Sequence, residues 1–208
     1  SFEGKIAFDT ATTNGTIDFE NVDFSYIQGK QVLNDFSVDI RKGHKIALVG
    51  ATGSGKTTIV NLLLRFYDID SGSIKIDGIN INDMSKKDLR DCISIVLQDA
   101  VLFEDTIENN VKYGKENATK EEILNALTAA NCHKFVNKLP LKEQTILSEG
   151  ASNLSAGQRQ LLTIARAILA DPKILILDEA TSSVDTRTEK RIQDAMVKLM
   201  ENRTSIII

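Results

Sequence analysis

Residues 46–57 read Ile-Ala-Leu-Val-Gly-Ala-Thr-Gly-Ser-Gly-Lys-Thr, and this stretch decides the fold. Its first four residues are apolar on every face, which is typical of a strand at the centre of a parallel sheet. Residues 57–66 then carry apolar side chains at helical spacing. A strand, a glycine loop and a helix form the context of a phosphate-binding loop, because glycines let successive N–H groups turn inward around anionic oxygens. We therefore expect Lys56 to reach the phosphates of a nucleotide and Thr57 to ligate Mg²⁺.

The rest of the chain supplies an α/β pattern around this loop. Upstream residues alternate between apolar and polar, as in antiparallel strands, and Asp77-Gly78 indicates a small hairpin. Residues 119–122 have the pattern of a capping box. We predict strands or helices at residues 17–24, 32–40, 74–81, 86–92, 93–97, 155–169, 174–177 and 188–200, with a last strand from Ser205. The predicted fold is α/β: a P-loop NTPase core with a mostly parallel sheet, an N-terminal antiparallel β portion and a helical subdomain insert at about 99–153, within one domain, 1–208.

Composition and charge narrow the function classes. The 208 residues are 42% hydrophobic, which is enough to bury a core, and no run approaches the roughly 18 apolar residues of a membrane-spanning helix. A formal net charge of −4 argues against nucleic acid as a partner, because nucleic-acid binding normally needs a basic face. Cys92 and Cys132 have no metal-type spacing, and we interpret them as idle or buried thiols of a reduced compartment.

Two further motifs carry acids and a hydroxyl. The apolar strand at residues 174–177 ends in Asp178 and Glu179, which taken alone could simply cap the next segment. Beside a phosphate loop, one such acid can hold Mg²⁺ and the next can polarise an attacking water. Ser155 lies in the segment 154–158, Leu-Ser-Ala-Gly-Gln, and is a good helix N-cap whatever else it does.

Taken in this order, the phosphate loop, the segment 154–158 and the acidic strand resemble the ATP-binding cassette (ABC) family. The family's Leu-Ser-Gly-Gly-Gln signature differs here at Ala156, and alanine fits a helical first turn but resists a left-handed backbone. The resemblance covers nearly the whole chain. It implies an ATPase in which Ser155 binds the γ-phosphate of ATP held by another subunit, so that two copies stack head to tail around two MgATP.

The resemblance also assigns the site residues. The nucleotide contacts are Tyr26, Gly50, Ala51, Thr52, Gly53, Ser54, Gly55, Lys56, Thr57, Thr58, Ser155, Gly157 and Gln158. The Mg²⁺ ligands, direct or through water, are Thr57, Gln98 and Asp178, and the catalytic residues are Glu179, Lys56 and Gln98. Without the resemblance, each of these polar side chains has an ordinary structural alternative.

Three of these alternatives stay open at the level of sequence. Tyr26 is placed where the family stacks an aromatic ring on adenine, but a plain core or surface tyrosine is the alternative. Gln98 could be a polar residue at a strand end. Residues 182–185, Ser-Ser-Val-Asp, resemble the family's D-loop, which crosses the dimer interface, but they could equally form a solvated turn.

Two stretches are similar to exporter-type members of the family. Residues 102–110 match the exporter pattern Leu-Phe-x-x-Thr-Ile-x-x-Asn, with Asp105 in place of a common glycine. Residues 148–150, Ser-Glu-Gly, resemble the exporter segment that touches loops of the membrane domain. The resemblance therefore implies the ATP-binding and ATP-hydrolysing motor domain of an ABC exporter, which powers transport of a substrate across a membrane.

The partners implied are a second nucleotide-binding domain, in a homodimer or heterodimer, and a transmembrane domain fused upstream of Ser1, at the cytoplasmic face of a membrane. Both ends of the chain look cut, and the family's switch histidine, which follows the strand near Ser205, is not among these residues. His44 and His133 do not match that motif, so we expect the chain to bind MgATP but to hydrolyse it poorly. The alternatives are a soluble ABC ATPase without transport and a regulatory nucleotide-binding half of a heterodimer.

Overall fold

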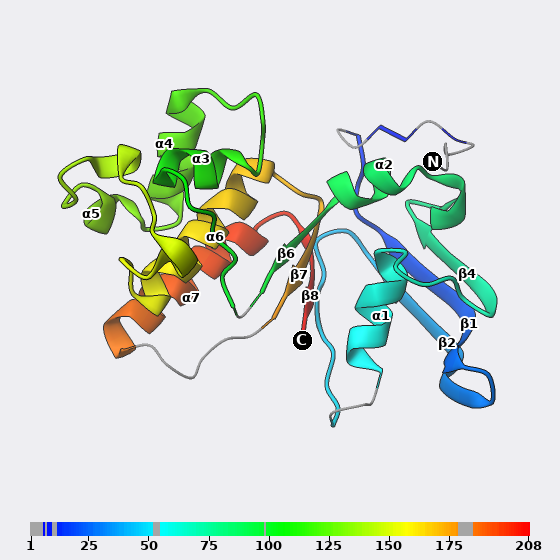
Figure 1. Ribbon diagram of the computed structural model, residues 1–208. Coiled ribbons are helices and arrows are strands. Elements are labelled where there is room, and N and C mark those ends of the chain that lie inside the picture. The colour runs from blue at the N-terminus through cyan, green and yellow to red at the C-terminus, as the bar shows by residue number, and fades with distance from the viewer. Residues whose placement is uncertain (1–5, 7, 10–11, 52–54, 98, 179–184) are drawn as a thin grey trace. The chain divides into compact units, whose positions relative to one another are not determined.

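The computed structural model describes residues 6, 8–9, 12–51, 55–97, 99–178 and 185–208 (Figure 1). The chain divides into two compact units. The first unit comprises Ser1–Ser94, Lys173–Ile176 and Asn202–Ile208, and the second comprises Ile95–Pro172 and Leu177–Glu201. The first unit is mainly β-sheet and the second is mainly helical, and each is described by itself.

An antiparallel sheet forms the N-terminal part of the first unit. Its strands are β1 (Ile17–Ile27), β2 (Lys30–Ile40), β4 (Ser71–Ile76) and β5 (Ile79–Asn80), in the order β2-β1-β4-β5. Alternate side chains of β1 and β4 are buried, as the alternating sequence predicts, and they pack with α1 residues in one hydrophobic core. Asp77 and Gly78 both have positive φ, of 50° and 78°, so the predicted β4–β5 hairpin turn is confirmed.

A second sheet has the order β3-β8-β7-β6, with β3 (Lys45–Ala47), β8 (Thr204–Ile207), β7 (Ile174–Leu177) and β6 (Ile93–Val96). β3 and β8 pair in parallel. The prediction that the strand before the phosphate loop lies at the centre of the sheet is wrong for the part of the chain that the structure describes: there β3 pairs with β8 alone, and its three residues are at least partly exposed. β7 has the place expected of a central strand, and all four of its residues are buried.

Helix α1 (Lys56–Leu63) follows the phosphate loop and buries most of its apolar residues. The predicted helix to Phe66 is too long, because Arg65 has a φ of 53° and the helix ends before it. Phe66 is 56% exposed rather than buried, and the Arg90 guanidinium lies 5.0 Å from the centroid of its ring. The short helices η1 (Ile81–Asp83) and α2 (Lys86–Asp91) complete this unit, and Ser85 caps α2.

The second unit is built around helix α6 (Ala156–Ala170), which contacts three other helices. These are α3 (Ile107–Lys112), α4 (Lys120–Ala129) and α7 (Thr186–Met200). The short helices α5 (His133–Val136), η2 (Lys142–Gln144) and η3 (Glu149–Ala151) lie between α4 and α6 in the chain. The predicted capping box of α4 is present: Thr119 Oγ1 accepts from the Glu122 N–H at 3.2 Å, and the Glu122 carboxylate accepts from the Thr119 N–H at 2.8 Å.

Both cysteines are free and buried, which confirms that they are buried thiols. Burial raises the pKa of the Cys92 thiol to about 12 and raises the pKa of Cys132 as well. Neither thiol is therefore a nucleophile at neutral pH. Within the described ranges, no helix combines the length and apolar character needed to cross a bilayer.

Candidate functional site

The phosphate loop ends in a backbone conformation that needs glycine. Gly55 has a φ of 93° and is the N-cap of α1, and a Cβ at this position would meet the Leu33 side chain at 3.4 Å. Among the residues that the structure describes, no side chain caps α1, and no acid lies in its first turn. The first N–H groups of the helix therefore remain available to an anion, which the helix dipole also favours. Thr52, Gly53 and Ser54 lie outside the described residues.

The side chains that begin α1 point to different partners. The Lys56 ammonium donates to the carbonyl oxygen of Gly50, so it reaches back to the residue that follows the strand. Gly50, Ala51 and Thr57 are exposed, while Thr58 is buried. The Thr58 hydroxyl lies 3.0 Å from the Tyr26 hydroxyl. The structure thus brings together two predicted contact residues, Tyr26 and Thr58, that are far apart in the sequence.

The segment predicted to reach a second subunit begins α6. Ser155 Oγ accepts from the Gln158 N–H at 3.2 Å, and Gln158 Oε1 accepts from the Ser155 N–H at 3.0 Å, so the two side chains form a capping box. Ala156 is the first helical residue, the conformation that suits alanine. Ser155 is exposed and Gly157 is buried. The predicted N-cap is confirmed, and its hydroxyl lies at the surface of this unit.

The acidic strand end belongs to the second unit from Leu177 onward. The Asp178 N–H donates to the carbonyl oxygen of Val96 at 2.9 Å, which fixes the backbone next to the end of β6. Gln98, Glu179 and the first three residues of the predicted D-loop lie outside the described residues. The last of the D-loop residues, Asp185, is the N-cap of α7 and accepts from the N–H groups of Arg187 and Thr188.

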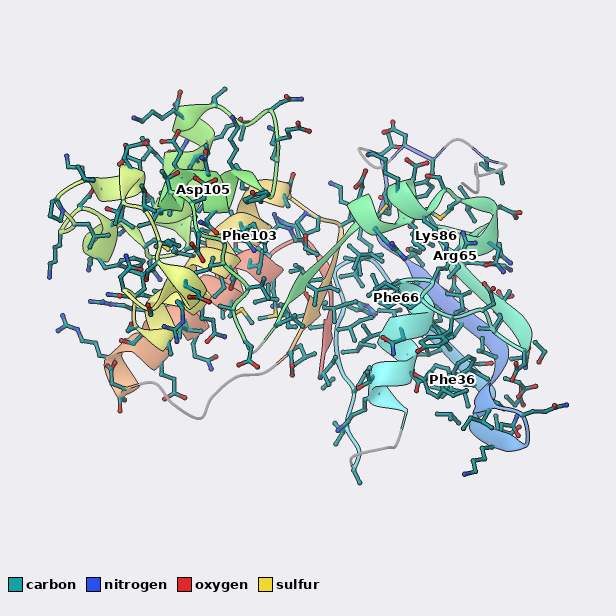
Figure 2. All side chains as sticks on the ribbon, viewed as in Figure 1. Phe36, Arg65, Phe66, Lys86, Phe103 and Asp105 are labelled. Atoms are coloured by element: carbon teal, nitrogen blue, oxygen red, sulfur yellow. The ribbon has the colours of Figure 1, made fainter. Side chains whose placement is uncertain are left out.

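The exporter-like stretch is held by a buried amide that the sequence pattern does not explain. Phe103 and Asp105 lie on the segment that leads into α3 (Figure 2). Asn110 is fully buried; its Oδ1 accepts from the Phe103 N–H at 2.8 Å, and its amide donates to the Phe103 carbonyl at 3.0 Å. Arg166 of α6 donates to the Asn110 carbonyl at 2.8 Å. This network gives the last residue of the exporter pattern a structural role.

Replacing Asn110 with Leu should destabilise the protein by about 1–3 kcal/mol, because the substitution removes a fully buried amide and its hydrogen bonds to the backbone N–H and carbonyl of Phe103. The matched control is Asn109→Leu on the same helix: its amide donates to Asp105 at 2.8 Å, but the side chain is exposed. Denaturant unfolding of both variants measures the difference. Equal, small losses in the two variants would contradict the structural role of Asn110.

Asp105 takes the place of a glycine common in the exporter pattern, and it has defined contacts here. Its carboxylate accepts from the Thr106 N–H at 2.7 Å and from the Asn109 amide at 2.8 Å. Thr106 in turn caps α3. The departure from the pattern is therefore accommodated by local hydrogen bonds.

The chemistry of these residues fits MgATP. A helix N-terminus without side-chain cap or acid, preceded by a glycine of positive φ, is suited to phosphate oxygens. The Thr57 hydroxyl and the Asp178 carboxylate are hard oxygen donors of the kind that Mg²⁺ prefers. Tyr26 is 44% exposed and offers ring surface to a base. Each of these three features is a property of the individual residues or of the helix terminus.

A protein-family model described as ABC transporter matches residues 33–182 of the chain. A fatty acid ABC transporter ATP-binding/permease protein of Mycobacterium bovis is 52% identical over 194 residues, which are 93% of this chain and 31% of that protein. An ATP-dependent lipid A-core flippase of Desulfotalea psychrophila is 48% identical over 193 residues, covering 93% of this chain and 34% of the flippase. The chain therefore spans about a third of the length of these relatives.

A solved structure of an ABC exporter is also similar to this chain. A bacterial Atm1-family ABC exporter with ATP bound has a TM-score of 0.84 and 39% sequence identity, over 94% of this chain and 34% of that one. At 39% identity, the two chains are similar in sequence as well as in fold.

Proposed function

The chain belongs to the ABC transporter family, and we propose that it is the ATP-hydrolysing motor domain of an exporter, at the cytoplasmic face of a membrane. It would work as a head-to-tail pair with a second nucleotide-binding domain and would drive a transmembrane domain of the same protein. The name ATP-binding/permease of the mycobacterial relative supports this arrangement, because it describes both parts in one polypeptide. The same relatives disfavour a soluble ABC ATPase without transport.

The phosphate side of the site would be formed by the first unit. The free N–H groups at the start of α1 and the Lys56 ammonium would hold the β- and γ-phosphates, and the Tyr26 ring would stack on adenine. In this state Lys56 would exchange its bond to the Gly50 carbonyl for bonds to phosphate oxygens. A phosphate oxygen carries negative charge and the Gly50 carbonyl does not, so the exchange adds an ion pair to the hydrogen bond and is favourable.

The exposed Ser155 at the start of α6 is the single observation that carries the head-to-tail pair. Its hydroxyl accepts one N–H of its own helix and remains accessible, and the helix dipole favours an anion there. We propose that Ser155, with Gly157 and Gln158, contacts the γ-phosphate held by the partner subunit. The Ala156 backbone is helical, so its departure from the signature leaves this geometry intact.

Catalysis would rest on positioning and charge. A bound Mg²⁺ would supply positive charge that stabilises the phosphates as the reaction proceeds. Thr57, Gln98 and Asp178 would hold the metal ion, directly or through water. Glu179 would orient the attacking water, which needs little covalent help in a loose phosphoryl-transfer transition state.

Replacing Ser155 with Asp should prevent MgATP-dependent pairing while leaving nucleotide binding to the single chain unchanged. Aspartate caps a helix as well as serine does, so α6 keeps its N-cap. Its carboxylate would, however, face the γ-phosphate of the partner, and exchanging a favourable polar contact for a like charge should weaken pairing at least about tenfold. Light scattering at saturating MgATP measures the pairing.

Thr119→Ala is the matched control, because Thr119 and Glu122 form the same kind of capping box at the start of α4. It should cost about 1 kcal/mol of stability and leave pairing unchanged. Pairing of the Ser155→Asp variant at wild-type protein concentrations would contradict the assignment of Ser155 to the interface.

Mixing two variants tests the head-to-tail geometry itself. A Lys56→Ala chain paired with a Ser155→Asp chain contains one site built from two intact halves and one site built from two altered halves. The mixture should therefore regain pairing and turnover that neither variant has alone. If each chain instead completed its own site, no combination of these two variants would restore activity.

A further inference from the structure

Three aromatic rings gather beside α1 in the first unit. Tyr26 packs on Phe24 with ring centroids 4.7 Å apart and an interplanar angle of 83°. Tyr67, which follows α1 in the chain, packs on Tyr26 at 4.9 Å and 88°. Both contacts have edge-to-face geometry, which adds about 0.5–1.5 kcal/mol to the burial of area in measured aromatic pairs. Neither neighbour is parallel to Tyr26, so neither ring occupies the stacked position that a base would take.

The Tyr26 hydroxyl is held by residues of α1. The Asn61 amide donates to the hydroxyl oxygen at 3.3 Å, and the Tyr26 hydroxyl lies 3.0 Å from Thr58 Oγ1. These bonds form a chain in which Asn61 donates to Tyr26 and Tyr26 can donate to Thr58. Thr58 is 4% exposed, so the end of this chain lies in the core.

These contacts fix Tyr26 without covering it. The Tyr26 ring packs against two neighbouring rings and its hydroxyl is hydrogen-bonded, yet the residue remains 44% exposed. The hydrogen-bond partners of this hydroxyl belong to α1. The first residues of the same helix are Lys56 and Thr57. The ring that would stack on adenine is therefore attached to the element that would bind the phosphates.

We infer that Asn61 and Tyr67 are positioning residues that hold the Tyr26 ring in the orientation in which it stacks on the adenine of ATP. The inference rests on the proposed function, because it takes Tyr26 as the base-stacking residue. Neither residue needs to touch the nucleotide. Each acts by raising the fraction of molecules in which Tyr26 already has its binding orientation.

The size of the effect follows from this role. A ring that is correctly placed for only a fraction of the time binds its ligand with an affinity reduced by that fraction. Removing one neutral hydrogen bond or one aromatic contact should therefore weaken MgATP binding about 2- to 10-fold. Binding of the phosphates alone should not change, because neither Asn61 nor Tyr67 lies in the first turn of α1, where the phosphates would bind.

The test compares MgATP with magnesium tripolyphosphate, which offers phosphates without a base. Asn61→Leu removes the donor, and Tyr67→Leu removes the ring. Each should weaken MgATP binding about 2- to 10-fold and leave tripolyphosphate binding within about twofold. The conservative variant Tyr67→Phe keeps the ring and should keep the wild-type affinity for both ligands.

The matched control is Tyr113→Leu in the second unit. Tyr113 is also an exposed tyrosine, and it packs on Phe103 with ring centroids 4.7 Å apart. Its replacement should change neither affinity. A spectroscopic readout checks the cause: the chain has no tryptophan and three tyrosines, so Tyr113→Phe leaves Tyr26 and Tyr67 as the tyrosine signals. In this background Asn61→Leu should reduce the near-ultraviolet dichroism of the unliganded chain at an unchanged melting temperature.

The outcomes separate this inference from the proposed function. Tyr26→Ala should weaken MgATP binding and spare tripolyphosphate; if it spares both, Tyr26 is not the base-stacking residue and the proposed site itself is wrong. If Tyr26→Ala behaves as expected but Asn61→Leu and Tyr67→Leu bind MgATP like wild type, the positioning role is overturned. Equal weakening of both ligands would also overturn it, since it would indicate general damage to α1.

Discussion

A Lys56→Ala chain is expected to lose MgATP binding by about 100-fold or more. Phosphate oxygens at the start of α1 would lose the Lys56 ammonium, and hydrogen bonds to charged groups are among the strongest in proteins. Lys56→Arg should bind poorly as well, because the planar guanidinium is larger than an ammonium and cannot replace its compact point charge in a tight loop. Titration calorimetry or equilibrium dialysis with MgATP measures the loss.

The matched control is Lys45→Ala, which removes an exposed lysine at the start of β3, ahead of the same loop. It changes the net charge by the same amount, so it separates a specific contact from a general electrostatic effect. MgATP binding of the Lys45 variant should stay within about twofold of wild type. Unchanged binding by a folded Lys56→Ala chain would rule out the phosphate-loop assignment.

The parts of the fold that the sequence predicts well are those set by near neighbours in the chain. The Ser155 cap, the Thr119 capping box and the Asp77-Gly78 turn each depend on residues within three positions of one another. The family and the α/β P-loop fold are also confirmed. They can be predicted from the sequence because their motifs are local segments in a fixed order. The assignment of an ATP-binding domain follows from the same segments.

The errors arise where a strand or side chain depends on distant residues. An apolar run such as 46–49 predicts burial, but its place in a sheet depends on which strands pair with it, and among the described strands β3 pairs with β8 alone. Phe66 fits the helical spacing of α1, yet the backbone turns at Arg65 and leaves the ring beside Arg90. Neither result is encoded in the periodicity of the segment itself.

Some contacts in the candidate site have no sequence signal at all. Asn61 and Tyr67 are separated from Tyr26 by more than thirty positions and belong to none of the motifs. The one hint is that Asn61 follows Thr58 by three residues, so both can reach the same neighbour from one side of α1. The exporter pattern includes Asn110, but it does not predict the contact with Arg166, which lies on another helix. Such networks can be identified from coordinates but not from spacing.

Glu179→Gln should preserve MgATP binding and lower turnover by about 10²- to 10⁴-fold, the range expected when a general base is lost. Glutamine has nearly the shape of glutamate but cannot accept the proton of the attacking water. Because Lys56 and Ser155 remain, the paired state can still form around MgATP. Opening of the pair would require ATP hydrolysis, which this variant carries out too slowly. The variant should therefore accumulate as an ATP-bound dimer, which light scattering at saturating MgATP detects.

The control for this prediction is Glu189→Gln, which removes one negative charge from the first turn of α7, the helix that follows Glu179 in the chain. It should lower turnover by less than about threefold, because a surface charge near a helix start contributes little. Two results for Glu179→Gln would be decisive against its role. Undiminished turnover would remove Glu179 from catalysis, and lost MgATP binding would make it a residue that holds the nucleotide or the metal ion. A monomer at saturating MgATP, with turnover lowered as expected, would leave Glu179 catalytic but show that hydrolysis is not what opens the pair.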